Sequence, residues 1–392
     1  MTYFKWEARK LWKKNKILLF LLIGPLIVCT LYTCNYFLAK TELEQMKQSV
    51  KEDIAFSGQL KETMEQNIFL ERNKQKLERL TAESGEILLK SQKEMIEDMT
   101  YFDSAKMIGE NQQPISQSVL DLNLAEIDYM KQNNIQPQKP LTLLLPKDYQ
   151  TNFTHEELDS YNYLNGERRN ANGLLFIYNF FKQGYSTYFI ALCILLFGSF
   201  FCSEKTTKHN HLSLLKLEGI SLSKILFTKS AIIFCYVCLF IVALFLPMLL
   251  LSIVLSGLGQ ASYPILYYFT TDLIKEYTWI TLAQYIFEAI TLMLFVSFFF
   301  IELLMLVSFF VKNEIYVWLA GGLFLIIGVL IPPSSFNPLS YIRVDEIISG
   351  EINLNQHNDF FSFTKSMLVL FAGLSIVFIL KTITGKVMAK IK

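Results

Sequence analysis

Long apolar runs alternate with polar stretches along this chain. A bilayer core about 30 Å thick needs roughly 20 apolar helical residues to cross it. Six runs approach or exceed that length, at residues 17–38, 185–202, 225–256, 281–311, 315–331 and 366–383. The first is not a cleaved signal peptide, because it is too long and lacks a clear small-residue cleavage site. The pattern predicts a mainly α, polytopic membrane protein with six transmembrane helices.

A long polar region, residues 40–173, separates the first run from the second. Over residues 40–100 apolar side chains recur at helical spacing, which predicts amphipathic helices with a break near residues 83–85 (ESG). The first helix is expected to continue out of the first span. LTLLLP at 141–146 indicates a short strand or a buried segment, and LLFIYNFF at 174–181 a helix in the membrane interface. We therefore expect a mostly helical domain here.

Basic residues near the ends of the runs indicate the orientation, because Lys and Arg are enriched in cytoplasmic loops. With the N-terminus inside, the cytoplasmic segments hold 15 basic and 4 acidic residues. The two short exterior loops then hold 2 basic and 6 acidic residues. The cytoplasmic segments are then 1–16, 203–224, 312–314 and 381–392, and the exterior loops are 257–278 and 332–364. The count predicts a multi-pass protein of the cell membrane with both termini in the cytoplasm. Residues 40–173 then form an extracellular domain, and residues 174–392 a five-helix transmembrane region.

The composition agrees with membrane spans plus one aqueous part. The chain is 52% apolar, which is high for a soluble protein, and 18% charged, which is high for a bundle without an aqueous domain. Only six of the 36 basic residues are arginine, a bias that suggests an AT-rich bacterial genome. All six cysteines lie in or beside apolar runs, so the polar region is not held by disulfides.

The sequence lacks the motifs of several kinds of active site. It contains no G-x-x-x-x-G-K-[ST] phosphate-binding loop and no G-x-S-x-G nucleophile turn. Its four histidines have no metal-ligand spacing. We therefore expect that the chain is not an enzyme and binds no metal, cofactor or nucleic acid of its own.

Two carboxylates, Glu288 and Glu302, fall inside the run 281–311. An acidic residue at the centre of a membrane helix costs about 2.5–3.5 kcal/mol on insertion scales, so it usually faces a bundle interior or water. The 14 residues between them make about four turns, which puts both on one face. Either they form a polar stripe along a translocation pathway, or Glu288 lies near the outer interface and Glu302 pairs with a polar neighbour for packing.

The cytoplasmic strip 203–224 has an amphipathic pattern. Its lysines keep it in the cytoplasm, and its leucines give a short helix one apolar face. Gly219 can end this helix, and Ser221 can cap the next one. A rigid interfacial helix between two spans suits a connector that another protein grips.

This strip resembles the cytoplasmic loop of ABC-2 type permeases in the run Glu204-Lys205, Leu214-Leu215-Lys216-Leu217-Glu218-Gly219-Ile220-Ser221, Lys224-Ile225 and Lys229. The run Asn337-Pro338-Leu339-Ser340-Tyr341 resembles the NPL motif that precedes the last span in the same family. The order of one span, a large exterior domain and five spans also matches one branch of the family.

The resemblance implies partners. Such permeases work as dimers, so it implies a second permease copy, and they work with cytoplasmic ABC ATPase subunits, which bind the ATP and Mg²⁺. The strip would be the coupling helix in a cleft of the ATPase, with contacts from Glu204, Lys205, Leu214, Leu215, Leu217, Glu218 and Gly219.

The N-terminal segment, residues 1–16, is predicted to be an amphipathic interfacial helix. Phe4 and Trp12 fall on its apolar face, and Lys13 is one of the basic residues on the other side. These three residues would anchor the helix to membrane lipids. A basic tail that only sets the orientation is the alternative.

We expect from these features the permease subunit of a bacterial ABC exporter. It would move a hydrophobic or amphipathic cargo outward: a peptide or antimicrobial, a lipid or a drug. The alternative is a membrane receptor or scaffold that transports nothing, whose exterior domain binds a peptide or a surface polymer.

Overall fold

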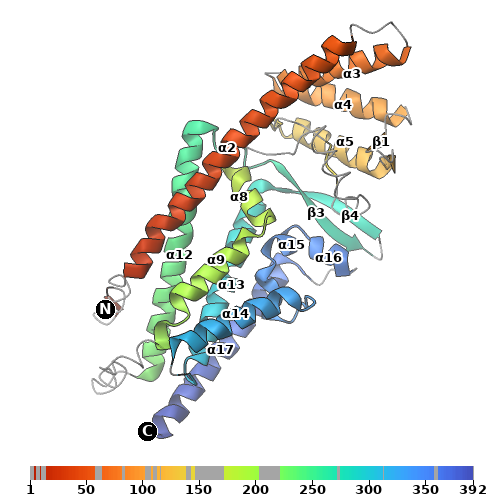
Figure 1. The fold of residues 1–392 in the computed structure, drawn as a ribbon. Coiled ribbons are helices and arrows are strands. Elements are labelled where there is room, and N and C mark those ends of the chain that lie inside the picture. The colour runs from red at the N-terminus through yellow and green to blue at the C-terminus, as the bar shows by residue number, and fades with distance from the viewer. Residues whose placement is uncertain are drawn as a thin grey trace.

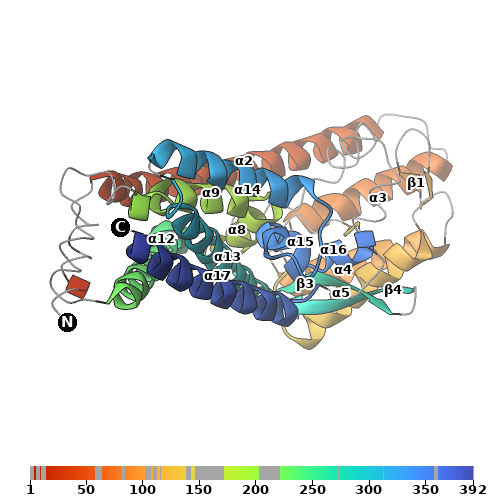
Figure 2. The same cartoon turned by 90° about the horizontal axis from the view of Figure 1, so that it is seen from below.

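The structure, a computed structural model, describes residues 4–5, 9, 15–57, 64–81, 84–101, 107–108, 113–114, 116–137, 143–145, 172–202, 221–271, 274–311, 313–356 and 361–391. These residues are mainly helical, with two small antiparallel sheets. Figures 1 and 2 show a bundle of long helices with shorter helices at one end. The start of the first long helix and the C-terminus both lie toward the opposite end.

The first long helix, α2 (Asn15–Ser57), is continuous over 43 residues. At 1.5 Å per residue it is about 65 Å long, more than twice the thickness of a bilayer core. It therefore contains the predicted first span, 17–38, and continues beyond it, as the sequence predicts. It packs on α12 (Leu222–Leu255), where the buried Tyr32 shares a 2.6 Å hydrogen bond with Ser256.

Three further helices follow α2 in the region 40–173: α3 (Met64–Thr81), α4 (Gly85–Tyr101) and α5 (Gln117–Gln132). The break between α3 and α4 confirms the prediction at residues 83–85. A two-residue pair, β1 (Met107–Ile108) with β2 (Gln113–Pro114), lies between α4 and α5.

Residues 143–145 form a buried segment and not a strand. The side chain of Asn123, on α5, accepts a hydrogen bond from the Leu144 N–H at 2.6 Å and donates to its carbonyl at 3.0 Å. One amide side chain thus satisfies the main-chain groups that a neighbouring strand would otherwise pair.

The bundle contains α8 (Gly173–Lys182), α9 (Tyr185–Phe197), α12, α13 (Leu282–Val307), α14 (Glu314–Leu330) and α17 (Phe363–Ile391). Within the described chain, five helices are long and apolar enough to cross a membrane: Leu19–Phe56, Tyr185–Cys202, Leu222–Leu255, Leu282–Val307 and Phe363–Val387. The sixth predicted span corresponds to α14, which is apolar but has only 17 residues, about 25 Å. The sequence predicts six spans, and five of the described helices are long enough to cross a membrane.

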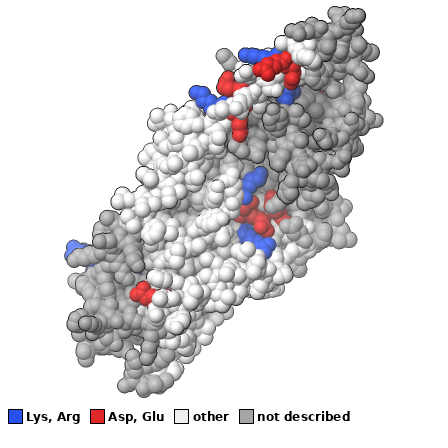
Figure 3. All heavy atoms as spheres, in the orientation of Figure 1, with Lys and Arg blue, Asp and Glu red and all other residues white. Residues whose placement is uncertain are grey.

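Large apolar side chains are exposed on the outer faces of α2, α12, α14 and α17. On the face that Figure 3 shows, charged side chains gather toward the α2–α3 end and in one middle patch, two smaller charged groups lie toward the opposite end, and wide described areas between them are uncharged. Exposed apolar side chains on long helices are expected where the helices lie in lipid.

The loop between α12 and α13, predicted only as an exterior loop at 257–278, contains a hairpin of β3 (Pro264–Thr271) and β4 (Ile274–Thr281). Tyr268 lies opposite Tyr277, with ring centroids 5.5 Å apart. The segment is rich in aromatic and β-branched residues, which favour strands and cross-strand pairs. The loop is therefore ordered where the sequence analysis assigned no structure.

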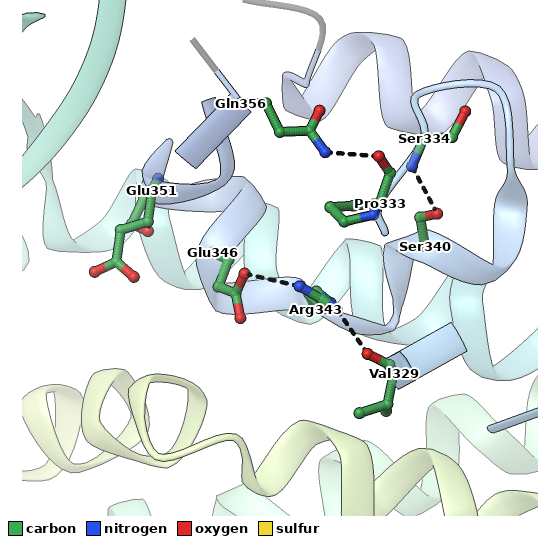
Figure 4. Close-up of polar contacts among 9 residues, drawn as sticks. Val329, Pro333, Ser334, Ser340, Arg343, Glu346, Glu351 and Gln356 are labelled. Carbon is green, nitrogen blue, oxygen red and sulfur yellow. Dashed lines mark hydrogen bonds and ion pairs between the residues drawn. The ribbon is translucent and has the colours of Figure 1, made fainter. Parts of the chain in front are cut away.

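The segment 332–364, predicted as the second exterior loop, is also folded over its described residues (Figure 4). It contains the 3-10 helix η2 (Pro338–Ile342) and the helices α15 (Val344–Ile348) and α16 (Glu351–Gln356). Asn337, in the NPL-like run, caps η2 by accepting a hydrogen bond from Leu339 N at 3.1 Å. Arg343 forms a 3.6 Å ion pair with Glu346 and donates to the Val329 carbonyl in the last turn of α14 at 2.6 Å.

Two more bonds hold this loop, from Gln356 Nε2 to the Pro333 carbonyl at 2.6 Å and from Ser334 N to Ser340 Oγ at 3.1 Å (Figure 4). The segment is thus a cap packed on the ends of the helices, which we call the loop cap (residues 332–356).

A substitution at Gly350 tests how closely the loop cap packs on β3. Its φ is +78°, and a β-carbon there would overlap the Tyr268 carbonyl of β3. We expect Gly350→Ala to lower the free energy of unfolding by about 1–3 kcal/mol from backbone strain, and by more from the overlap. Thermal unfolding of the full chain in detergent measures this loss of stability. Gly322→Ala, at an open helical position, is the matched control and should be neutral or stabilising.

Candidate functional site

A buried charge cluster joins three of the long helices. Lys381 of α17 donates hydrogen bonds to Glu302 of α13 and, at 3.2 Å, to Ser230 of α12. Its Nζ also lies 3.6 Å from Met305 Sδ. These contacts place α12, α13 and α17 side by side, and we call the group the Glu302–Lys381 cluster.

Both charged members are removed from solvent, since Lys381 is 0% and Glu302 3% exposed. Burying an ion costs several kcal/mol, and an ion pair with further hydrogen bonds offsets this only when its geometry is good. One carboxylate oxygen of Glu302 accepts the bond from Lys381, whereas the other, Oε1, is buried with no hydrogen-bond partner. This oxygen can accept a hydrogen bond from a polar group that enters the bundle.

A second buried cation lies one residue away from Ser230. Lys229 is 0% exposed, and its Nζ lies 4.8 Å from the centre of the Phe200 ring. This distance permits a cation–π attraction, which gains strength where water is excluded. One turn of α12 therefore contacts both Lys381 and the chain that follows α9.

The helices meet closely here because apolar residues surround the charges. On α13, the side chains of Phe300, Ile301, Leu304 and Met305 around Glu302 are all buried. Gly373 of α17 lets the two helices approach farther along, since a β-carbon there would lie 3.0 Å from Phe299. The charges are thus held in an apolar setting where electrostatic interactions are strong.

The structure separates the two predicted carboxylates. Glu302 is in the cluster and has the polar partner that the packing alternative supposed. Glu288 is half-buried and accepts a 3.0 Å hydrogen bond from Gln284 on its own helix. The 14 residues between them correspond to about 21 Å of helix, so the two do not form one compact site.

Lys381 is the first residue of the segment 381–392 that the orientation count assigned to the cytoplasm. It lies within α17, which continues to Ile391, and it is fully buried. Because Glu302 is 79 residues away, nothing local in the sequence marked the pair.

The predicted coupling residues Glu204, Lys205, Leu214, Leu215, Leu217, Glu218 and Gly219 lie outside the described residues, as do Trp12 and Lys13. Phe4 is described and is 43% exposed. Ser221 caps α12 as predicted, with its hydroxyl accepting a 3.4 Å hydrogen bond from Lys224 N.

Among the residues that the structure describes, no three His, Cys, Asp or Glu side chains are grouped to hold a metal ion.

Comparison with known proteins gave no family model, no curated protein and no solved structure that matches this chain. The fold itself defines the class. It is a mainly helical chain in which several helices are long and apolar enough for a membrane-embedded protein, with charges buried between three of them.

Proposed function

We propose that this chain is the permease subunit of a bacterial ABC exporter, driven by a separate cytoplasmic ATPase subunit that binds ATP and Mg²⁺. A second copy of the permease completes the transporter. The cargo is hydrophobic or amphipathic and leaves the cell: a peptide, a lipid or a drug.

One observation carries the proposal most directly. The end of α9, the start of α12, the start of α2 and the end of α17 lie at one end of the bundle, and α3–α5 lie at the other (Figure 1). An exporter with its motor on one side and an exterior domain on the other needs this arrangement. The predicted amphipathic strip 203–224 connects α9 to the start of α12 at the motor end, where an ATPase would bind.

The Glu302–Lys381 cluster gives a route from the motor into the bundle. The helix α12 begins at Leu222, in the last residues of the strip, and reaches Ser230 in just over two turns. A push on the strip moves α12 as a rigid rod, and with it the Ser230 hydroxyl that contacts Lys381. The transport cycle then alternates between two arrangements of α12 against the α13–α17 pair.

Leu217→Glu in the strip tests the proposal. A carboxylate on the apolar face of the coupling helix is expected to abolish co-purification with the ATPase and its stimulated ATP hydrolysis, because the charge would be buried unpaired in the interface. Leu258→Glu is the matched control, since Leu258 is 41% exposed in the turn after α12.

The ATPase for this test is sought among the neighbouring genes as a small protein with a P-loop, and it is co-expressed and purified with the full chain. Equal association of the Leu217→Glu variant and the unmodified chain would contradict the exporter proposal. It would favour a receptor or scaffold, for which the strip is only a tether.

A further inference from the structure

The turn that follows α14 exposes large apolar side chains. Phe336 is 87% exposed, more than any other large apolar side chain among the described residues. Leu330, the last residue of α14, and Ile331 after it are also exposed. They continue an exposed apolar face of the helix, formed by Ile315, Leu319, Leu323 and Ile326. We call residues 331–336 the apolar turn, and its surface calls for a partner that is itself apolar.

No charge interrupts this surface. Residues 315–342 contain no Lys, Arg, Asp or Glu. The next residue, Arg343, donates back to the Val329 carbonyl of α14 and pairs with Glu346 of the loop cap (Figure 4). Charged side chains are the costliest ones to place in lipid, so a long stretch without them is typical of a membrane-embedded segment.

The N–H groups of the apolar turn are mostly bonded within the protein. Ser334 N donates to Ser340 Oγ at 3.1 Å, and Asn337 N, directly after the turn, donates to the Ser334 carbonyl at 3.0 Å. Among the described contacts of this turn, only the N–H groups of Ser335 and Phe336 have no acceptor. Both belong to the last two residues of the turn, and such groups bond to water or headgroups at the surface of a membrane. This pattern fits a turn that reaches the headgroup level.

Side chains of the loop cap bond to the carbonyls of the turn. The Pro333 carbonyl accepts from Gln356 Nε2 at 2.6 Å, and the Ser335 carbonyl accepts from the Tyr341 hydroxyl. Pro332 and Pro333 have no N–H and need no acceptor there. Unsatisfied main-chain groups are costly in lipid, so an irregular segment at membrane depth must bond them within the protein. The apolar turn largely meets this condition.

The place of the turn in the fold agrees with lipid contact. The helix α14 has 17 residues, about 25 Å, which is short of a bilayer core of about 30 Å. In Figures 1 and 2, α16 and the β3–β4 hairpin lie beyond the end of α14, toward α3–α5. The apolar turn is therefore not the outermost part of the bundle, and its surface extends that of α14 by roughly the missing length.

We propose that the apolar turn is inserted in the leaflet nearest α3–α5, where Leu330 and Phe336 contact lipid acyl chains. The last residues of the turn lie at the headgroup level. Together, α14 and the turn complete a membrane crossing, and the exterior loop begins after Phe336 and not at residue 332. This lipid-binding surface belongs to the chain itself, so it does not depend on an ATPase partner.

Tryptophan fluorescence of the full chain in vesicles tests the proposal, with Phe336→Trp as the probe. The vesicles contain phosphatidylcholine and phosphatidylglycerol, with bromine on the acyl chains either near the headgroup or near the methyl end. Subtracting the signal of the unmodified chain, which has four tryptophans, leaves the added fluorescence. We expect brominated lipid to quench most of this fluorescence, most strongly with bromine near the headgroup. Iodide on both sides of the bilayer should leave it nearly unchanged.

Two further variants calibrate the depth. Leu323→Trp, at an exposed position in the middle of α14, should be quenched most strongly by bromine near the methyl end. Phe56→Trp is the matched control, because it makes the same substitution at a 64% exposed position of α2 beyond the predicted span 17–38. It should be quenched by iodide and not by brominated lipid.

The outcomes separate lipid from other surroundings. Because Phe336 is so exposed, Phe336→Trp replaces almost no packing contact, and we expect the variant to fold normally. Quenching of Phe336→Trp by iodide, as in Phe56→Trp, would put the turn in water and overturn the proposal. Protection from both quenchers would also overturn it, because the turn would then be covered by protein, such as a second copy of the chain.

Discussion

Glu302→Gln and Lys381→Met are each expected to lower the free energy of unfolding by about 3–5 kcal/mol, and the double substitution to recover most of that loss. Each single change leaves the opposite charge buried without its partner, since Lys381 is 0% and Glu302 3% exposed. Removing both charges leaves a neutral side chain pair of similar volume. The coupling energy of the cycle therefore reports the ion pair itself.

Chemical unfolding of the four proteins in detergent measures this cycle. Glu288→Gln is the matched control, because it makes the same substitution on the same helix at a half-buried residue bonded only to Gln284 among the described contacts. It should change stability by no more than about 0.5 kcal/mol, as surface substitutions do. Single variants as stable as this control would show that the pair is not formed.

Transport separates a structural role of the pair from a functional one. Under the exporter proposal, Glu302→Ala should reduce transport while association with the ATPase remains, because the strip is unchanged. In the double variant Glu302→Gln with Lys381→Met, stability recovers but the charged contact between helices is absent. Full transport by this variant would reduce the cluster to a packing element, and lost transport with normal stability would place it in the transport cycle.

The helices could be predicted from the sequence because their signals are local. A helix repeats every 3.6 residues, so the run at 17–38 and the amphipathic pattern after it predict one continuous helix, and α2 has that form. Ser221 and the break at residues 83–85 were found for the same reason, since caps and breaks are set by a few neighbouring residues.

The cluster and the loop cap could not be predicted in this way. The contact of Lys381 with Glu302 spans 79 residues, and no periodicity relates positions that far apart. The hairpin at 264–281 carried a usable signal, an aromatic and β-branched run with a polar turn in its middle. The charge count that assigns the segment to an exterior loop does not use this signal. The loop cap has no such pattern, because its order depends on side chains that bond to main-chain groups far along the chain.

Asn353 shows how much stability such bonds supply, and Asn353→Ala is expected to lower the free energy of unfolding by about 2–5 kcal/mol. The Asn353 side chain donates to the Phe361 carbonyl at 2.8 Å and accepts from the Phe361 N–H at 3.0 Å, and it is 1% exposed. Alanine would leave both main-chain groups of Phe361 buried and unpaired, directly before α17 begins at Phe363.

Asn353→Asp separates the two bonds of this side chain. Aspartate can still accept from the Phe361 N–H, but it cannot donate to the carbonyl and would bury a charge, so the loss should equal or exceed that of alanine. Asn133→Ala is the control, because the Asn133 side chain is exposed and bonds only to the Tyr129 carbonyl on its own helix. Thermal unfolding of the full chain measures all three. If Asn353→Ala unfolds at the same temperature as Asn133→Ala, the bonds of Asn353 do not hold α17, and the start of that helix must be fixed by its packing on other elements such as α13.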